Sequence, residues 1–458
     1  MRGSEFDADL VASTSISVYS KLPSHGKPLV RNNGIPEWTI LSTLSLFLPS
    51  NQLQVISLGA GVKVLPANKL PPLGDTLHDC HSEILARRGF VRWLLEEAGR
   101  IVRGESHRNV LVASKGKFRL IAGVQVCLYV SVLPCGDASM LHTAAHQPAS
   151  MALLKSTSSS ISPTSMTHMG TVRGRNGYEQ YGAIRTKPGR ADSSPAISLS
   201  CSDKLASYSV TGLQGALLSE LYDPIYIDHV VVGGVEMAAP AGIVLPEGVC
   251  WWDKIKQELE RALYGRLEGI RDRPSSPYRL NRPEIHLTTI EFPDSKPAIA
   301  RTSAHEPVPS VNALLHITSS YPPTSEVIFN GCKQGGVWKS PGTKLIVDRA
   351  RSKVCKYELM KEYLVLRDLL DMPSLSLTTT YHDLKHPTLS AYQDAKAILR
   401  GSVIGSIRSD DVFGDFQNTS GNEGVDPPFK GWIVSGKRYE SFTIHGKVEQ
   451  DSIERRAV

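Results

Sequence analysis

The chain has 458 residues, of which 41% are hydrophobic and 21% charged, a composition typical of a globular protein with a large core rather than of a disordered chain. No apolar run approaches the roughly 20 residues of a membrane-spanning helix, and no signal-peptide core is present, so no membrane partner is expected. The net charge of +6 permits an acidic partner such as RNA without requiring one. Seven widely spaced cysteines predict reduced thiols in an intracellular compartment, the cytoplasm or the nucleus.

The N-terminal part of the chain predicts a helix followed by a strand. Residues 1–6, Met-Arg-Gly-Ser-Glu-Phe, are typical of an expression-vector remnant. Residues 37–48 are largely apolar and end before Pro49, which predicts a helix. Residues 52–65 carry apolar side chains at short spacing around Gly59 and Gly61, which predicts a strand with a tight turn or bulge.

Residues 78–88, His-Asp-Cys-His-Ser-Glu-Ile-Leu-Ala-Arg-Arg, combine a possible metal ligand, an acid and two cations. His81 and Glu83 form an H-x-E pair, in which an imidazole can hold zinc while a carboxylate that is not a ligand moves protons for the attacking water. The start of a surface helix would give the same triplet, so the pair needs further support.

The segment 83–95 is apolar around most of a helix, which predicts a helix enclosed on several sides. Arg87 and Arg88 lie within it. Because a buried guanidinium is costly unless it is paired, the two arginines indicate a buried anion, or else side chains that reach out to water.

The clearest predicted strand is 124–135, where five Val or Leu side chains alternate with other residues. It ends at Pro134-Cys135-Gly136-Asp137, where proline suits a helix start and the helix dipole would favour a thiolate. A Pro-Cys after an H-x-E pair is typical of zinc deaminases, although a buried structural cysteine is the alternative. The usual second cysteine is replaced by Ala138, so a last zinc ligand would have to come from elsewhere.

A third motif follows a polar segment. Residues 156–195 are rich in Ser, Thr, Gly and Pro with scattered basic residues, which predicts a polar insertion. After it, Cys201 again stands at a predicted helix start, ahead of a helix-like segment over 205–221.

Three ordered motifs resemble the zinc-site motifs of the RNA-editing adenosine deaminases, and of their tRNA-specific branch in particular. They are Asp79-Cys80-His81-Ser82-Glu83, Leu133-Pro134-Cys135-Gly136-Asp137 and Ser200-Cys201-Ser202-Asp203-Lys204, and Arg185-Thr186-Lys187-Pro188-Gly189-Arg190 and Gly212-Leu213-Gln214-Gly215 are similar too. The resemblance covers the chain from about residue 20. It implies an α/β fold with a cytidine-deaminase-like core sheet and flanking helices, enlarged by a C-terminal half that closes around a buried polyanion.

The resemblance also implies roles for the site residues. His81, Cys135 and Cys201 would bind Zn2+, and Glu83 would shuttle the proton of the attacking water. Asp79 and Lys187 would connect the zinc ligands to the polyanion, inositol hexakisphosphate. The positions that match the family's contacts with this cofactor are Arg87, Arg88, Lys204, Lys356, Tyr381, Lys385, Tyr392, Lys396 and Trp432.

Two positions depart from that contact set. Ser207 stands where the animal editors carry Arg, and Ser435 stands where they carry Lys. Lys437, two residues further on, is a candidate replacement for the second. The resemblance therefore leaves the cofactor contacts at these positions open.

The rest of the chain predicts more strands and helices and no convincing domain boundary, so we expect residues 7–458 to form one domain. Strands are predicted within 222–234, 314–330 and 343–348, and helices over 251–270 and 350–370. The segments expected as insertions lie near 156–195, 272–312, around a strand-like 284–292, and 405–428.

The function implied by the resemblance is hydrolytic deamination of adenosine to inosine in tRNA, at the adenosine 3′ of the anticodon of alanine tRNA. A single-stranded loop lets that base leave its stack at least cost. Candidate phosphate contacts at the rim of the site are Arg173, Arg175, Arg185 and Arg190. No obligatory protein partner is expected.

Two other functions stay open. A deaminase of other RNA, of free nucleosides or of cytosine would use the same chemistry. The wide spacing from Cys135 to Cys201 and the alanine at position 138 argue against free nucleosides and cytosine as substrates. A non-catalytic, zinc-stabilised RNA-binding protein would keep the three zinc ligands and have no need of Glu83.

Overall fold

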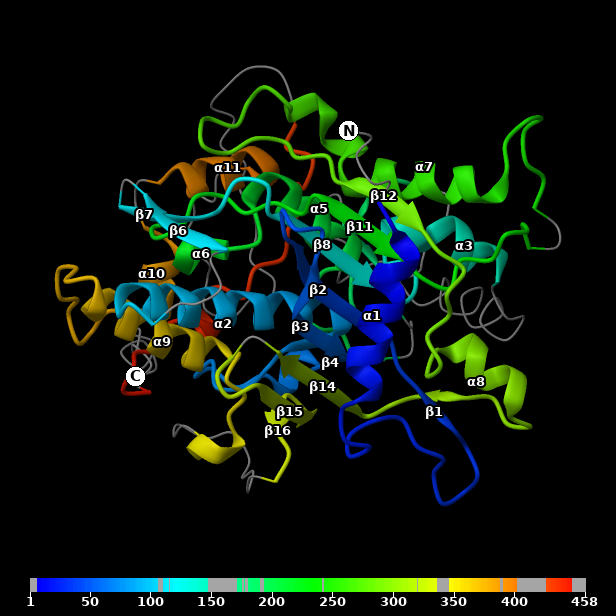
Figure 1. Cartoon of the computed structure of the whole chain (residues 1–458), viewed down its shortest axis with the longest axis horizontal. Helices are drawn as coiled ribbons and strands as arrows, with labels where there is room; N and C mark the ends of the chain where they lie inside the picture. Colours follow the sequence, from blue (N-terminus) through cyan, green and yellow to red (C-terminus); the bar gives the residue numbers. More distant parts are fainter. Residues whose placement is uncertain are drawn as a thin grey trace, which may run out of the picture.

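An eight-stranded mixed sheet runs through the centre of the molecule (Figure 1). The computed structural model describes residues 6–105, 110–114, 116–146, 171–174, 177, 180–189, 193–240, 243–318, 320–335, 346–387, 390–401 and 426–446. In spatial order the strands are β12 (Glu284–Leu287), β11 (His229–Val232), β8 (Gln125–Val130), β2 (Leu41–Phe47), β3 (Leu53–Ala60), β14 (Asn312–Ile317), β15 (Thr324–Phe329) and β16 (Cys332–Lys333). The first three strands are mutually parallel, and every other neighbouring pair is antiparallel.

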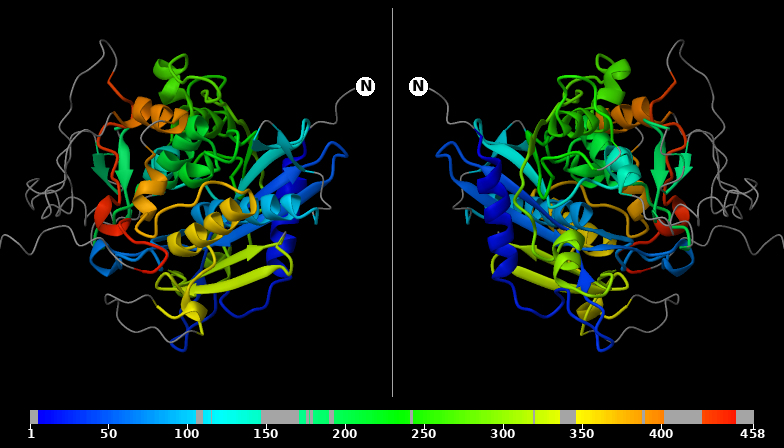
Figure 2. Two further views of the ribbon diagram at one scale, coloured as in Figure 1. Left: turned by 90° about the vertical axis from the view of Figure 1, so that its left-hand side faces the viewer. Right: turned by 90° about the vertical axis from the view of Figure 1, so that its right-hand side faces the viewer.

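Helices cover both faces of this sheet (Figure 2). Val126, Leu128 and Val130 of β8 face the cluster that includes α2 (Ser82–Val102), whereas Cys127 and Tyr129 face the cluster that includes α1 (Ala8–Ser20). This division follows from the two-residue period of a strand. The first turn of α2 is thereby fixed beside the centre of the sheet.

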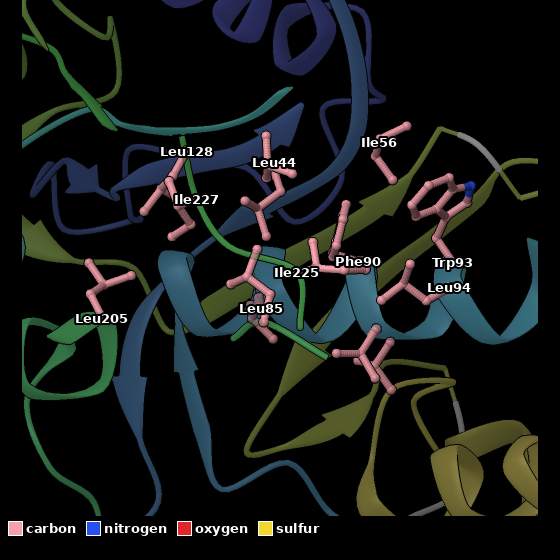
Figure 3. Packing of buried hydrophobic residues seen from close by; sticks show 14 of the residues in the cluster. Leu44, Ile56, Leu85, Phe90, Trp93, Leu94, Leu128, Leu205, Ile225 and Ile227 are labelled. Carbon is pink, nitrogen blue, oxygen red and sulfur yellow. The ribbon is translucent and has the colours of Figure 1, made fainter. Parts of the chain in front are cut away.

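The packing of α2 on the sheet forms the main core (Figure 3). Leu85, Phe90 and Leu94 of α2 are fully buried, and the cluster includes Leu44 and Ile56 from two central strands. Burial of each such side chain stabilises the fold by about 1.5–3 kcal/mol. The start of α2 comes so close to β3 that a Cβ atom on Gly59 would lie 2.4 Å from the Ser82 carbonyl oxygen, so only glycine fits there.

The prediction of a helix over 37–48 is wrong. The segment forms β1 (Glu37–Trp38) and the central strand β2. Because both faces of β2 are covered by helices, its residues are buried at nearly every position, including Ser42 and Thr43. A strand buried on both faces lacks the alternation that distinguishes it from a buried helix.

Most other predicted elements are present, with bounds that differ from the predicted ones. The segment 52–65 forms β3 and β4 (Val62–Val64) with a break at Gly61, 83–95 lies within α2, and 222–234 contains β11. The helix predicted over 251–270 is present as α7 (Trp251–Leu263), which is followed by the 3-10 helix η3 (Gly265–Ile270).

Three predicted bounds are wrong. The segment 205–221 is divided by Gly212, at φ +73°, into α5 (Cys201–Thr211) and α6 (Gly215–Leu218). The helix predicted from 350 begins six residues later, as α9 (Lys356–Leu369). Of the strand predicted at 343–348, the described part, 346–348, is not a strand and leads into η4 (Asp348–Ala350).

The expected insertions are partly described. Residues 272–312 supply the edge strand β12 and α8 (Lys296–Thr302), so this segment extends the central sheet. Within 156–195, β9 (Thr171–Arg173) pairs in parallel with β10 (Ile184–Thr186). Most of 405–428 lies outside the described residues.

The remaining elements surround the sheet. They are η1 (Ala67–Lys69), β5 (Asp79–His81), β6 (Leu111–Ser114), β7 (Lys117–Leu120), η2 (Asp137–Ser139), α3 (Met140–Ala145), β13 (Val308–Pro309), α10 (Tyr381–Lys385), α11 (Ala391–Arg400) and η5 (Lys437–Tyr439). Within the described ranges, no helix is both long and apolar enough to cross a bilayer.

Candidate active site

Three potential metal ligands meet from three separate elements. His81 ends β5 and is the N-cap residue of α2, Cys135 lies in the loop after β8, and Cys201 is the first residue of α5. The Nδ1 atom of His81 lies 3.6 Å from the Cys201 sulfur and 3.8 Å from the Cys135 sulfur. All three donor atoms lie within 4.8 Å of one another.

This donor set fits a zinc ion. Zn–S bonds of about 2.3 Å and Zn–N bonds of about 2.0–2.1 Å at tetrahedral angles place the nitrogen and the sulfur about 3.5 Å apart. The two observed distances are close to this value. Three protein ligands leave the fourth position open, as in catalytic zinc sites.

Backbone geometry brings the two cysteines together. Gly136 has φ +104°, and a Cβ atom there would lie 2.1 Å from the Ser200 hydroxyl oxygen. The backbone N–H of Ser202 donates to the Cys135 carbonyl oxygen at 3.0 Å. Glycine at 136 therefore permits the loop after β8 to lie directly against the start of α5.

The helical segment expected after Cys135 is present but short, and it begins at Asp137 as η2 and continues as α3. The helix that faces the Cys135 sulfur is α5, and the backbone N–H of Cys201 donates to this sulfur at 3.4 Å. The hydrogen bond with the Cys201 thiol is the main reason that the pKa of Cys135 lies well below its usual range. Burial, together with Cys135, raises the pKa of Cys201.

Glu83 lies beside the donor set in the first turn of α2, with an exposed fraction of only 4%. The hydroxyl of Ser82 donates to its carboxylate at 3.1 Å and also contacts the Ser42 hydroxyl at 2.7 Å. Within the described part of the chain Glu83 has no salt bridge. Its carboxylate is therefore held by a neutral donor and is not neutralised by a bound cation.

Asp79 and two lysines form a buried network behind the zinc ligands. Lys187 donates to both carboxylate oxygens of Asp79, at 2.8 and 3.1 Å, and to the Cys201 sulfur at 3.2 Å. Lys204 donates to Asp79 at 2.5 Å and to the Ser198 hydroxyl at 2.7 Å. Burial alone would raise the pKa of Asp79, but the two ammonium groups hold it well below its usual range.

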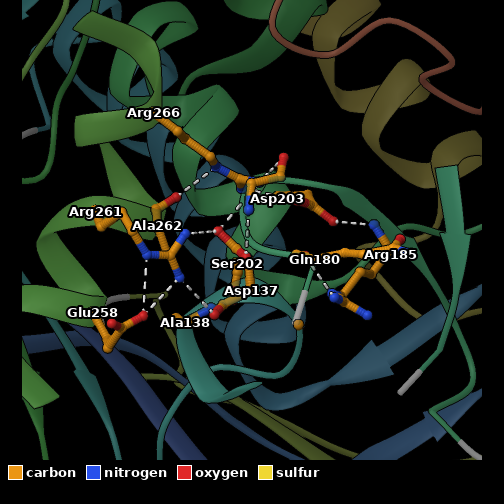
Figure 4. A network of polar contacts seen from close by, with 12 residues as sticks. Asp137, Ala138, Gln180, Arg185, Ser202, Asp203, Glu258, Arg261, Ala262 and Arg266 are labelled. Carbon is orange, nitrogen blue, oxygen red and sulfur yellow. Dashed lines mark hydrogen bonds and ion pairs between the residues drawn. The ribbon is translucent and has the colours of Figure 1, made fainter. Parts of the chain in front are cut away.

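A second polar network fixes the loop after Cys135 (Figure 4). Arg261 of α7 forms a 2.6 Å ion pair with Asp137, which is fully buried. Arg266 pairs with Asp203 of α5 at 2.8 Å, and the Ser200 hydroxyl donates to the same carboxylate at 2.6 Å. Ion pairs thus anchor both cysteine-bearing segments to α7 and η3.

The prediction that Arg185 contacts RNA phosphates is wrong. Its exposed fraction is 1%, and its guanidinium donates to the carbonyl oxygens of Gly177 and Gln180 (Figure 4). Arg173 is partly buried and donates to the Ser193 carbonyl oxygen. The positions 175 and 190 lie outside the described residues.

Further along α2, basic side chains from distant segments of the chain surround one carboxylate, that of Glu440. We call this group the cation cluster; its members are Arg87, Arg88, Lys356, Lys385, Lys396 and Arg400. Glu440 pairs with Lys356 at 3.0 Å and with Lys385 at 2.5 Å. In the described ranges no other carboxylate forms a salt bridge with the cluster.

Aromatic rings separate the cations. The guanidinium of Arg87 lies 4.3 Å from the ring centre of Tyr208, and the ammonium of Lys356 lies 5.8 Å from that of Tyr381. Tyr392, which was expected among the ligands, is 8% exposed and lies on α11 with Lys396. Trp432 lies beside Arg400, whose guanidinium is 3.9 Å from the centre of the Trp432 ring.

Several donors of the cluster have no partner. The Nε atom of Arg87 and a terminal nitrogen of Arg88 are buried without a hydrogen bond to any described residue. Burial lowers the pKa of Lys396 to about 6 and that of Lys356 to about 8. The cluster therefore combines buried donors that lack partners with positive charges that burial disfavours, an arrangement that is costly in the ligand-free protein.

The comparisons with known proteins agree with this geometry. The family model of the adenosine-deaminase (editase) domain matches residues 57–405, which include all three zinc-ligand candidates and Glu83. The chain belongs to this family. It is a hydrolytic deaminase of α/β architecture with a large mixed sheet.

Full-length relatives extend the match beyond the domain. The tRNA-specific adenosine deaminase 1 of Schizosaccharomyces pombe is 31% identical over 404 residues, 86% of this chain and 92% of that protein. The protein of the same name from Saccharomyces cerevisiae is 28% identical over 362 residues, 77% and 82% of the two chains. The double-stranded RNA-specific editase B2 of Rattus norvegicus is 30% identical over 244 residues, 52% of this chain and 30% of that protein.

Sequence reasoning missed three residues near the zinc-ligand candidates and the cation cluster. Arg400 follows Lys396 by four residues, the spacing that places two side chains on one face of a helix, so it could have been found. Glu440 carries no local signal, because its partners lie in other elements. His78 has a buried, unpartnered Nε2 atom, and burial lowers its pKa to about 3.

A second group of three possible donors lies at the edge of the sheet. His229 Nδ1 and His286 Nε2 are 3.1 Å apart, and Glu284 lies 3.6 and 3.7 Å from them. Phe6 stacks on both imidazole rings at 4.1 Å. This group must be controlled for in any measurement of bound metal.

Proposed function

We propose that this protein is a zinc-dependent deaminase that converts adenosine to inosine in tRNA, at the adenosine 3′ of the anticodon of alanine tRNA. The observation that carries the proposal is the triangle of His81, Cys135 and Cys201 donor atoms with the buried Glu83 beside it. The two yeast relatives named as tRNA-specific deaminases support tRNA as the substrate. The seven free cysteines support the expected reducing, intracellular compartment.

The chemistry divides between the metal and the protein. A zinc ion held by the three ligands would lower the pKa of a water that attacks C6 of the purine. Glu83 would accept a proton from the attacking water at its carboxylate and pass it to the purine ring, and a second proton, from the new hydroxyl on C6, would pass to the amino group, so that ammonia leaves and inosine remains. The Ser82 hydroxyl orients the Glu83 carboxylate through the 3.1 Å hydrogen bond.

The lysine network tunes the metal ligands. Lys187 places a buried positive charge 3.2 Å from the Cys201 sulfur and so favours the thiolate that zinc requires. Asp79 forms ion pairs with both Lys187 and Lys204. It also accepts a hydrogen bond from the backbone N–H of His81 at 3.1 Å, which fixes the metal-binding histidine.

The cation cluster is proposed to hold inositol hexakisphosphate. Six cations face one carboxylate, Glu440, and buried nitrogens of Arg87 and Arg88 lack partners. Phosphate oxygens would accept hydrogen bonds from these nitrogens and compensate the charges. Lys204 reaches toward this region from α5 while it binds Asp79, so it would connect the cofactor to the zinc ligands.

The decisive experiment incubates the zinc-loaded protein with alanine tRNA and sequences the RNA for inosine beside the anticodon. Free adenosine and a double-stranded RNA serve as competing substrates, since the rat relative is named for double-stranded RNA. Conversion of the anticodon-loop adenosine alone is expected. No conversion by zinc-loaded protein would contradict the proposed substrate.

The same assay with Glu83→Gln tests the mechanism. This variant keeps the size of the side chain and removes the base, so activity should fall by at least about 100-fold while zinc content is unchanged. Inosine formation at the wild-type rate would mean that another group moves the proton. Loss of zinc together with activity would mean that Glu83 acts on the metal site instead.

A further inference from the structure

Arg400 is the last residue of α11, a helix that packs against α5. Tyr392, Lys396 and Arg400 follow one another at intervals of four residues and therefore share one face of the helix. Lys396 and Arg400 influence each other electrostatically across this face. Arg400 thus extends the cation cluster by one helical turn.

The contacts of Arg400 are unusual for a partly buried arginine. Its guanidinium lies 3.9 Å from the ring centre of Trp432 and donates to the Ser207 hydroxyl at 3.1 Å. Its Nε atom is buried without a partner among the described residues. No carboxylate in the described ranges pairs with it, so its charge is uncompensated.

The Trp432 ring and the Ser207 hydroxyl hold the guanidinium in place, and its Nε–H has no partner among the described residues. A planar fork of this kind suits bidentate contact with phosphate oxygens. Burial lowers the pKa of Arg400 to about 10, and an anion at this edge would oppose that shift. The Trp432 ring and the Ser207 hydroxyl thus position the Arg400 side chain, and its Nε–H can donate to a ligand.

The hydroxyl that Arg400 contacts belongs to Ser207 of α5. This serine is 1% exposed and lies one turn after Lys204 on α5, where the family that the sequence resembles carries an arginine in its animal members. The Arg400 guanidinium donates to the hydroxyl at that same position. A guanidinium therefore reaches position 207 from the neighbouring helix.

We propose that Arg400 is a direct ligand of the bound polyanion and supplies the guanidinium that position 207 lacks. The inference rests on the proposed role of the cation cluster as a polyphosphate site. With one carboxylate against six cations, a single phosphate, which carries a charge of about −2, would leave most of the excess charge uncompensated. The ligand class is therefore a small molecule that carries several phosphates.

The test compares four proteins: wild type, Arg400→Met, Arg400→Met with Ser207→Arg, and the control Arg271→Met. Arg271 is 60% exposed and lies beside Asp272, outside the cluster. Each purified protein is denatured in acid, and released phosphorus is counted per chain. The rise in unfolding temperature on addition of inositol hexakisphosphate is measured in parallel.

Wild type and Arg271→Met should retain one polyphosphate per chain through prolonged dialysis. Arg400→Met should bind inositol hexakisphosphate about 10- to 100-fold more weakly, because it loses charge-assisted hydrogen bonds. Adding Ser207→Arg should restore retention. Equal retention by Arg400→Met and wild type, or no recovery in the double variant, would overturn the role of Arg400.

Arg400→Lys provides a second variant if Arg400→Met does not fold. It keeps the charge but loses the planar fork, so its affinity for inositol hexakisphosphate should lie between those of wild type and Arg400→Met; wild-type affinity would contradict the inference. A wild-type protein that neither carries nor responds to inositol hexakisphosphate would refute the polyanion site itself. Inosine formation in tRNA, scored separately, decides the proposed activity independently.

Discussion

The ammonium group of Lys187 lies 3.2 Å from the sulfur of Cys201, and the lysine side chain is only 2% exposed. Its other contact is the carboxylate of Asp79, so one buried cation faces a thiol and an acid. Burial alone would lower the pKa of Lys187, but Asp79 and the neighbouring thiols hold it well above its usual range. The lysine is therefore charged wherever the fold is intact.

Replacing Lys187 by methionine should damage both the metal site and the fold. Asp79 would keep only Lys204 as a cationic partner, and a broken buried ion pair typically costs about 3–5 kcal/mol. Loss of the charge near Cys201 should weaken zinc binding about 10- to 100-fold. Zinc competition with a chelator and urea unfolding measure the two effects.

Lys296→Met is the matched control, because Lys296 pairs with Glu306 at 3.0 Å on the surface, where both side chains are exposed. An exposed pair of this kind contributes about 0–1 kcal/mol. Equal losses of zinc affinity in the two variants would show that the Lys187 ammonium does not influence the metal ligands.

Cys201→Ser should remove bound zinc, because an alcohol replaces one of three protein ligands. Cys250→Ser is the control: Cys250 is exposed, caps α7 through its sulfur, and can be replaced by serine with the cap retained. Both measurements should use protein that also carries His286→Ala, which removes the second donor group at the sheet edge. Unchanged zinc content in Cys201→Ser would mean that the third ligand is another residue.

Gly136→Ala tests the close approach of the two cysteine-bearing segments. A methyl group at 136 would lie 2.1 Å from the Ser200 hydroxyl oxygen, so the loop must move away from α5 and separate Cys135 from Cys201. We expect loss of zinc and of activity, measured by metal analysis and inosine formation. A fully active Gly136→Ala protein would refute this account of the site.

Gly104→Ala separates this effect from backbone strain. Gly104 also has a positive φ, +71°, but a Cβ atom there would meet nothing within 4 Å. Only the conformational penalty of about 1–2 kcal/mol applies. Zinc content and activity should stay at the wild-type level in this variant.

Lys396 should make the stability of the ligand-free protein depend on pH. Its pKa falls to about 6 in the folded protein and is about 10.4 when unfolded, so between these values the unfolded chain binds the extra proton. The free energy of unfolding should therefore rise with pH from 7 to 9, by at most about 1.4 kcal/mol per pH unit from this group. Urea titrations at several pH values measure the slope.

Lys396→Met should reduce that slope, and so should saturating inositol hexakisphosphate, which favours the charged lysine. The slopes of variant and wild type must be compared with each other, because Lys356, with a pKa of about 8, contributes to the slope in the same pH interval. If the free energy of unfolding rises with pH as steeply in Lys396→Met as in wild type, the surroundings of Lys396 do not lower its pKa.

The zinc-ligand candidates could be found from sequence because each lies in a short local pattern. His81 and Glu83 are two residues apart, and each cysteine follows a proline or serine at the end of a connecting segment. The structure brings these three motifs within ligand distance of one another. Local spacing points to His81, Glu83 and Cys135, whereas Cys201 is assigned as a ligand through the resemblance of the three ordered motifs to a known family.

Features that depend on distant contacts were not predictable in the same way. The sequence of β2 predicts a helix because layers on both faces of the strand, contributed by other segments, remove its alternation. The sequence around Arg185 predicts a surface cation because the partners of this side chain, the Gly177 and Gln180 carbonyl oxygens, are backbone atoms with no sequence signature. Glu440 acquires its role only through Lys356 and Lys385.

The placement of the cation cluster has a consequence for the order in which the chain folds. Arg87 and Arg88 are synthesised early, whereas Trp432 and Glu440 follow 344 to 353 residues later. At roughly 5–20 residues per second, α2 leaves the ribosome about 20–70 seconds before the last residues of the cation cluster region are made. The two arginines are therefore without these partners in the nascent chain, and bringing the two segments together closes a very long loop, which is a slow step of folding.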